Sequence, residues 1–175
     1  MEKVRIYYIL NRGLSSDDLI RRCASHFCGV DCSGMEIIRE RGKKPFFASG
    51  EPCFSVSHSG DLWVCVFAWH EVGCDVQEMR ANDKYKRLAA RWFCESEAER
   101  TVTERDFYDI WSRKEAYVKF LGIGINEEFR RFDSFAPSGA LIRDFTVPGG
   151  EKRYSAAAAM REDFIIETFD FNQIG

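Results

Sequence analysis

The stretch CFSVSHSGDLWVCVFA, residues 53–68, constrains the fold more than any other part of the chain. Two apolar runs flank a short polar segment that ends in Gly60-Asp61. This pattern predicts a meander of three antiparallel strands, at 54–57, 62–69 and 72–77. The triplet Ser57-His58-Ser59 falls in the first predicted turn, where its side chains either favour the turn or cradle an anion.

Elsewhere, apolar residues recur at helical or alternating spacing. Helices are predicted between Ser15 and Gly29 and at 82–93, 96–102 and 106–120. Further strands are predicted at 4–10, 35–40, 131–135, 141–145, 154–160 and 164–169, with a turn at 11–13. The order of these elements indicates an α+β fold of two related halves, residues 1–72 and 73–175.

Composition excludes several classes of protein. A net charge of −3 over 175 residues argues against nonspecific nucleic-acid binding, which needs a broad positive field. The chain has no apolar run of about 20 residues and no recognisable signal peptide, so we expect no membrane segment and a cytoplasmic location. The spacing of Cys23, His26, Cys28 and Cys32 matches no standard zinc pattern, and the seven cysteines are expected to be structural.

Two further motifs carry oxygen and nitrogen ligands. On a strand, Asp75 and Gln77 share one face, where they either hold a hard cation such as Mg²⁺ or face water. On a helix, Glu115 and Lys119 are neighbours four residues apart. They form either a solvated ion pair or a carboxylate and an ammonium suited to phosphoryl-type transfer.

The order of these motifs resembles that of the 4′-phosphopantetheinyl transferases of the Sfp type. In that family a Gly-Lys-Pro turn often comes first. A Ser-His-Ser-like turn then precedes a Gly-x-Asp-x-Glu strand, and a Trp-x-x-Lys-Glu-x-x-x-Lys helix follows. The matching segments here are Lys43-Lys44-Pro45, Ser57-His58-Ser59, Gly73-Cys74-Asp75-Val76-Gln77 and Trp111-Ser112-Arg113-Lys114-Glu115 with Lys119. The ordered set, spanning residues 42–124, is far more specific than any single motif.

The resemblance implies a fold and a reaction. The fold would be two pseudo-symmetric halves, each a small, mostly antiparallel sheet with a long helix, and coenzyme A would bind in the cleft between them. The reaction would be the Mg²⁺-dependent transfer of the phosphopantetheine arm of coenzyme A to a serine of an apo acyl or peptidyl carrier protein. Adenosine 3′,5′-bisphosphate would be released.

The resemblance also implies roles for individual residues. Asp75 and Glu115, with Gln77, would bind Mg²⁺, and Glu115 or a water held by it would take the serine proton. Lys119 and His58 would contact the pyrophosphate. The nucleotide end would lie near two further residues, Lys44 and Ser57. The family often has an acid where this chain has Gln77, whose amide oxygen adds no charge and should bind the metal more weakly.

Partners and an alternative function complete the predictions. Carrier proteins of this class are acidic, and the basic stretch Lys84, Lys86, Arg87 and Arg91 is either their docking surface or a solvated helix face. A monomer is expected, because both walls of the cleft would come from one chain. The alternative is a catalytically weakened protein that binds coenzyme A or the carrier, for which Gln77 is the evidence.

Overall fold

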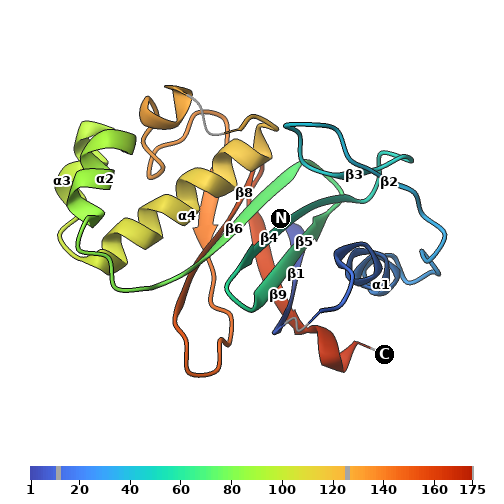
Figure 1. Ribbon diagram of the computed structural model, residues 1–175. Helices are drawn as coiled ribbons and strands as arrows, with labels where there is room; N and C mark the ends of the chain where they lie inside the picture. Colours follow the sequence, from blue (N-terminus) through green and yellow to red (C-terminus); the bar gives the residue numbers. More distant parts are fainter. Residues whose placement is uncertain (11–12, 125–126, 175) are drawn as a thin grey trace.

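The computed structural model describes residues 1–10, 13–124 and 127–174 (Figure 1). Its helices are α1 (Ser16–Cys28), α2 (Tyr85–Trp92), α3 (Glu95–Arg100) and α4 (Glu104–Phe120), with short 3₁₀ helices at Glu127–Arg130 (η1) and Phe171–Gln173 (η2). Its strands are β1 (Glu2–Leu10), β2 (Ile37–Ile38), β3 (Phe46–Phe47), β4 (Cys53–Ser59), β5 (Leu62–Ala68), β6 (Val72–Glu78), β7 (Leu141–Asp144), β8 (Tyr154–Met160) and β9 (Phe164–Asp170). Among these residues no helix is long and apolar enough to cross a membrane.

The elements form four layers in the order helix, sheet, sheet, helix (Figure 1). The first sheet has the order β4-β5-β1-β9, the second has the order β6-β8-β7, and β2 and β3 pair separately. Alternate side chains of β1 and β5 pack on α1 on one side and on the second sheet on the other. Because both faces of β5 are buried, its sequence is a continuous apolar run. The α+β class predicted from the sequence is confirmed.

The predicted meander is wrong in its third strand. β4 and β5 pair antiparallel as expected, but β6 pairs antiparallel with β8 in the other sheet. The reason is that β5 already has β4 on one edge and β1 on the other. No hydrogen-bonding edge of β5 is left for β6, and the chain crosses to the second layer after Ala68.

Other predictions also need correction. Ser57, His58 and Ser59 belong to β4, so the turn contains only Gly60 and Asp61. The strand predicted at 131–135 is absent from this described segment, which forms a turn after η1. Its aromatic residue Phe132 packs against α4. The turn predicted at 11–13 falls partly on residues 11–12, outside the described residues.

The last strand returns to the first sheet. β9 pairs in parallel with β1, from Glu2 opposite Phe164 to Tyr8 opposite Asp170. The first sheet therefore contains one strand from the predicted second half, and the boundary at residues 72 and 73 stays a prediction.

Small residues let α4 lie close to the second sheet. A Cβ atom at Gly73 would stand 2.0 Å from the carbonyl oxygen of Ala116 and 2.3 Å from the nitrogen of Phe120. On β8, Ala159 opposite Gly73 and Ala157 opposite Asp75 are buried under the helix. The glycine of the Gly-x-Asp motif is thus required by the close contact between α4 and β6.

Candidate active site

The carboxylate of Asp75 lies where β6 meets α4. Val72, Cys74 and Val76 point into the core between the sheets, and Asp75 therefore faces the helix. Asp75 is 2% exposed, and its Oδ1 accepts a hydrogen bond of 2.7 Å from Nζ of Lys119. The motifs that the sequence places 44 residues apart thus meet in one ion pair.

Gln77 lies on the same face as Asp75, as the strand alternation predicts. Its Nε2 donates to Oδ2 of Asp75 at 2.7 Å. In this arrangement the amide N–H of Gln77 stabilises the carboxylate by donating a hydrogen bond to it. If Gln77 is to offer its oxygen to a cation, the amide group must turn over.

Three serines of β4 connect the two sheets. The hydroxyls of Ser55, Ser57 and Ser59 accept the backbone N–H groups of Cys74, Val76 and Glu78, at 3.0, 3.2 and 2.9 Å. β4 and β6 therefore lie side by side although no backbone ladder joins them. Alternate serines satisfy donors of β6 that would otherwise lack partners in the interior.

Ser57 has a second contact that the other two serines lack. Its hydroxyl donates to Oδ1 of Asp75 at 2.7 Å, and the residue is 6% exposed. Since Ser57 both accepts from β6 and donates to Asp75, it fixes the orientation of this carboxylate. The predicted position at the nucleotide end stays a prediction, and both hydrogen bonds described for the Ser57 hydroxyl are with β6.

Glu115 stands on the same face of α4 as Lys119, one turn earlier. Burial, followed by repulsion from Asp75, raises the pKa of Glu115 to about 7, although Lys119 opposes the shift. Burial acts to lower the pKa of Lys119, but Asp75 outweighs it and the pKa is raised. Two carboxylates thus share a partly buried site with one ammonium, an arrangement that favours a bound cation.

A cavity of about 260 Å³ opens over these groups. Glu115 and Lys119 line it from α4, Ser55 from β4, and Lys44 from the Lys-Lys-Pro turn. Lys44 donates to the carbonyl oxygen of Val72 at 2.9 Å and pairs with Glu71. The cavity therefore joins two of the segments that carry the resemblance, the Lys-Lys-Pro turn and the helix with Glu115 and Lys119.

His58 is oriented differently from Ser57. His58 pairs with Trp63 in a regular antiparallel register. Because side chains alternate along a strand, His58 and Ser57 point to opposite faces of β4. The imidazole is exposed, and within the described part of the chain no hydrogen bond or ion pair joins it to Asp75, Glu115 or Lys119. Its predicted contact with pyrophosphate stays a prediction.

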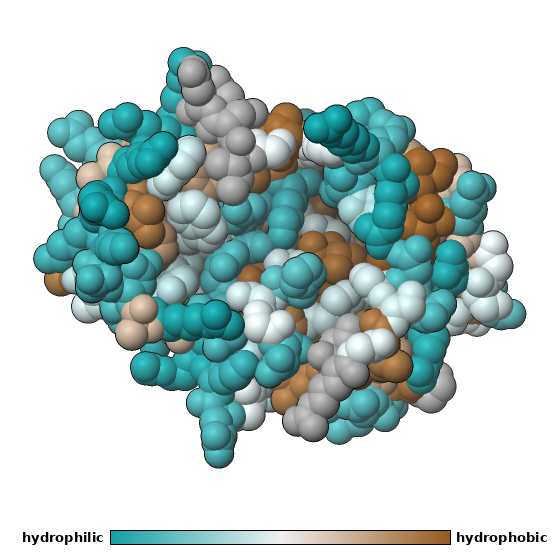
Figure 2. Space-filling model, viewed as in Figure 1, coloured by the Kyte–Doolittle hydropathy of each residue, from teal (hydrophilic) through white to brown (hydrophobic). Residues whose placement is uncertain are grey.

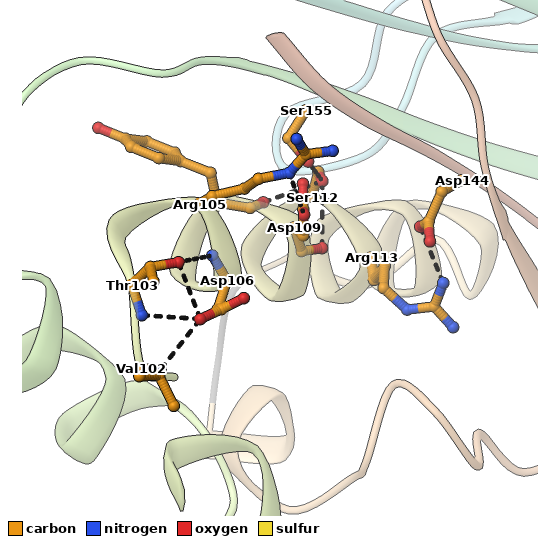
Figure 3. A network of polar contacts seen from close by, with 10 residues as sticks. Val102, Thr103, Arg105, Asp106, Asp109, Ser112, Arg113, Asp144 and Ser155 are labelled. Atoms are coloured by element: carbon orange, nitrogen blue, oxygen red, sulfur yellow. Dashed lines mark hydrogen bonds and ion pairs between the residues drawn. The ribbon is translucent and has the colours of Figure 1, made fainter. Parts of the chain in front are cut away.

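The long helix that carries Glu115 is held at several points (Figure 3). At its N-terminus, Thr103 N donates to Asp106 and Asp106 N donates back to the Thr103 hydroxyl, a capping box. In the middle, the hydroxyls of Ser112 and Ser155 lie 2.8 Å apart and join α4 to β8. Arg113 donates to Asp144 at the end of β7.

Sequence reasoning missed a second lysine–carboxylate pair on this helix. Lys114 and Glu97 are both fully buried, with Nζ of Lys114 2.7 Å from Oε2 of Glu97 and 2.6 Å from the carbonyl oxygen of Phe132. The Phe132 ring lies under the ammonium at 4.0 Å. The signal was present, because Lys114 lies on the helix face that contains the apolar residues Ile110 and Val118.

A group of possible metal ligands surrounds this second pair. Ligand atoms of Cys94, Glu97 and Asp133 lie within 4.8 Å of one another, and the described residues contain no other such group. However, Oε2 of Glu97 accepts from Lys114, and its Oε1 accepts from Ser134 N at 2.7 Å. A cation placed there would face the buried ammonium of Lys114, and these residues therefore form a hydrogen-bonded joint between α3 and α4.

Comparison with known proteins leads to the same part of the chain. The model of the 4′-phosphopantetheinyl transferase superfamily matches residues 71–163. The 4′-phosphopantetheinyl transferase AcpT of Salmonella typhi is 38% identical over 115 residues, covering 61% of this chain and 59% of that protein. A 4′-phosphopantetheinyl transferase of Bacillus subtilis is 32% identical over 135 residues, covering 71% of this chain and 59% of its own length.

A third relative, the 4′-phosphopantetheinyl transferase HetI of Nostoc, is 29% identical over 118 residues, with 61% of this chain and 50% of HetI covered. The chain thus spans 50–59% of the length of these three relatives. The segment matched by the family model is more than half of the 175 residues and includes β6 and α4, with Asp75, Glu115 and Lys119. The chain therefore belongs to the 4′-phosphopantetheinyl transferase superfamily.

Proposed function

We propose that this protein transfers the 4′-phosphopantetheine group of coenzyme A to a serine of an apo carrier protein and releases adenosine 3′,5′-bisphosphate. The observation that carries the proposal is that Glu115 and Lys119 line a cavity while Lys119 donates to the buried Asp75. Two acids and an ammonium are the groups that transfer of a phosphoryl-type group between oxygens requires.

The donor set fits Mg²⁺. Asp75 and Glu115 supply two carboxylates close enough for Asp75 to raise the pKa of Glu115, and a divalent cation would remove that repulsion. Gln77 would supply its amide oxygen after turning over. When bound there with the coenzyme's pyrophosphate, Mg²⁺ would neutralise the developing charge on the phosphate oxygens.

The residues of the chain then have separate tasks. Glu115 accepts the proton of the carrier serine as the serine oxygen forms its bond to the β-phosphorus. The bond from this phosphorus to the bridging oxygen breaks, and the electron pair leaves with adenosine 3′,5′-bisphosphate. Lys119 has three N–H groups, of which one is given to Asp75, so another can stabilise the leaving phosphate.

The direct test uses coenzyme A, Mg²⁺ and an apo carrier protein. Mass spectrometry of the carrier should show the added phosphopantetheine group, and omission of the metal should abolish the addition. If no adduct forms on fatty-acid, polyketide or peptide carriers although coenzyme A binds, the transfer is refuted.

That negative result would favour the alternative, a protein that binds coenzyme A or the carrier but has lost turnover. The observation behind the alternative is Gln77, which donates to Asp75 and adds no negative charge to the site. A Gln77→Glu variant distinguishes the two. In a working transferase it lowers the Mg²⁺ concentration needed for half-maximal rate, and in a protein without turnover it restores no transfer.

The basic stretch on α2 is the proposed docking surface for an acidic carrier. Lys84, Lys86, Arg87 and Arg91 are all exposed, while Ala89 is buried against the neighbouring helices. The exterior of α2 and α3 is largely hydrophilic in Figure 2, at the left of the view. Reversing the charges of Arg87 and Arg91 should raise KM for the carrier without changing coenzyme A binding, and an unchanged KM would refute this surface.

The pseudo-symmetric arrangement belongs to the same proposal. Each main sheet has one long helix on its outer face, α1 on the first and α4 on the second. The cavity beside Lys119 is lined by β4 of the first sheet and by α4. One chain thus supplies both walls, which favours a monomer, and light scattering at assay concentration tests this.

A further inference from the structure

The fold divides the group of Cys23, His26, Cys28 and Cys32 that lie close together in the sequence. Cys23 is buried in the core between α1 and the first sheet. The Nδ1 atom of His26 lies 2.9 Å from the hydroxyl of Tyr7, on β1. Cys28 and Cys32 are both free thiols, and neither belongs to the candidate active site. These two cysteines therefore have a separate environment.

The end of α1 brings Cys28 and Cys32 together. Cys28 is the last residue of the helix, and Gly29 follows in the left-handed conformation that is usual at a helix C-terminus. Cys32 N then donates to the hydroxyl of Ser25 at 2.9 Å. Since Ser25 lies about one turn before Cys28 on the helix, the segment 29–32 folds back onto the last turn of α1.

The two thiols meet at the edge of the core beneath this turn. Cys32 is 3% exposed and belongs to the core between α1 and the first sheet, and Cys28 packs half-buried against the same core. Burial, followed by the charge and the hydrogen bond of Cys32, raises the pKa of Cys28 to about 11. The sulfur atoms are thus in contact, which is the first requirement for a disulfide.

The other half-buried cysteines have different neighbours. The sulfur of Cys53 lies 3.9 Å from the carbonyl oxygen of Gly50. The sulfur of Cys94 lies 3.2 Å from the hydroxyl of Ser96 and 3.3 Å from a carboxylate oxygen of Glu97. Because these contacts are with oxygen, Cys53 and Cys94 serve as internal controls for the pair at the end of α1.

We propose that Cys28 and Cys32 form a reversible disulfide by exchange with a low-molecular-weight disulfide such as oxidised glutathione. The more accessible Cys28 reacts first as its thiolate, attacks one sulfur of the small disulfide, and releases one small thiol as that S–S bond breaks. Cys32 then attacks the sulfur of Cys28 as a thiolate, and the second small thiol leaves. Two electrons pass from the protein to the small disulfide, and the two leaving thiolates take up the two protons.

Mass spectrometry of the folded protein tests the bridge. Oxidised glutathione at about pH 9, where the thiolate of Cys28 is less scarce than at neutral pH, should remove two hydrogen atoms from the wild-type protein. Peptide mapping should locate the loss at residues 28 and 32. Cys28→Ser should abolish it, and the matched control Cys53→Ser should not. No loss in the wild type, the same loss in Cys28→Ser, or glutathione that stays attached to Cys28 overturns the proposal.

A stability measurement shows whether the fold accommodates the bridge. The oxidised protein should unfold at a higher urea concentration than the same protein with dithiothreitol, because a cross-link constrains the unfolded chain. In Cys28→Ser the midpoint should not respond to the reductant. A lower midpoint for the oxidised wild-type protein would mean that the bridge strains the fold, and it would overturn the proposal. Neither measurement uses coenzyme A or a carrier, so the outcome does not depend on the proposed function.

Discussion

Two lysines of α4, less than two turns apart, each pair with a carboxylate of another element, and the two pairs differ in burial. The side chains of Lys114 and Glu97 are both 0% exposed, and we call them the sealed pair. Lys119 and Asp75 have the same 2.7 Å separation, but the lysine is 26% exposed at a cavity wall. The same chemical pair therefore serves two purposes, according to whether a ligand can reach it.

The sealed pair holds elements together. Glu97 comes from α3, the carbonyl partner of Lys114 belongs to Phe132, and Glu97 also accepts from Ser134 N. Burial lowers the pKa of Lys114, although Glu97 opposes this. In the open pair the charge of Asp75 dominates, and the pKa of Lys119 is raised. Lys119 therefore keeps its positive charge where an anionic ligand can reach it.

The largest effect is expected at the open site. Glu115→Gln should lower the rate of transfer by about 10²- to 10⁴-fold, the usual contribution of a general base. Single-turnover rates of phosphopantetheine addition would measure it. The exposed Glu99 offers a control, since Glu99→Gln removes a carboxylate that does not line the cavity and should leave the rate unchanged. A Glu115→Gln rate within threefold of wild type would remove Glu115 from the mechanism.

At the sealed pair the effect should be on stability. Lys114→Met leaves Glu97 buried without its counter-ion and should lower the free energy of unfolding by about 3–5 kcal/mol in urea denaturation. Adding Glu97→Gln removes the second charge and should restore most of the loss. Lys119→Met should cost less, because Asp75 keeps its hydrogen bonds from Ser57 and Gln77. Equal losses in Lys114→Met and Lys119→Met would contradict the comparison.

The serines of β4 allow a finer comparison. Ser57→Ala and Ser55→Ala each remove a hydroxyl that accepts from β6, and each should cost about 1 kcal/mol of stability. Only Ser57 also donates to Asp75, so Ser57→Ala alone should weaken Mg²⁺ activation and lower the transfer rate about tenfold. The idea fails if both variants change the Mg²⁺ dependence alike.

A further effect is on the pH dependence of stability. In the metal-free protein the pKa of Glu115 is raised from 4.5 to about 7, so between these values the folded chain holds a proton that the unfolded chain has released. The free energy of unfolding should therefore fall as pH rises through this window, by at most about 1.4 kcal/mol per unit. Denaturation at pH 5 and 7.5 with a chelator should show a flatter dependence in Glu115→Gln. Parallel curves would argue against the raised pKa.

Much of the site was predictable because its residues lie close together in the sequence, within one helix or one strand. Glu115 and Lys119 share a helix face, and Asp75 and Gln77 share a strand face, whatever the rest of the chain does. Most helix and strand positions followed from the same periodicity. The errors came where a partner had to be chosen from another part of the chain. The local pattern predicts β6 beside β5 and a strand at 131–135, but β6 pairs with β8 and residues 131–135 form a turn after η1.

By itself the sequence determined which side chains share one face of a helix or strand, since backbone geometry fixes the side-chain period. It also determined, through the order of three motifs, which family the chain belongs to. Only the tertiary structure decided which elements meet. β5 had no free edge, so β6 paired with β8, and Gly73 let α4 approach until Lys119 reached Asp75. The role of Ser57 and the sealed pair of Lys114 and Glu97 depend on contacts between distant segments, and local spacing does not encode those contacts.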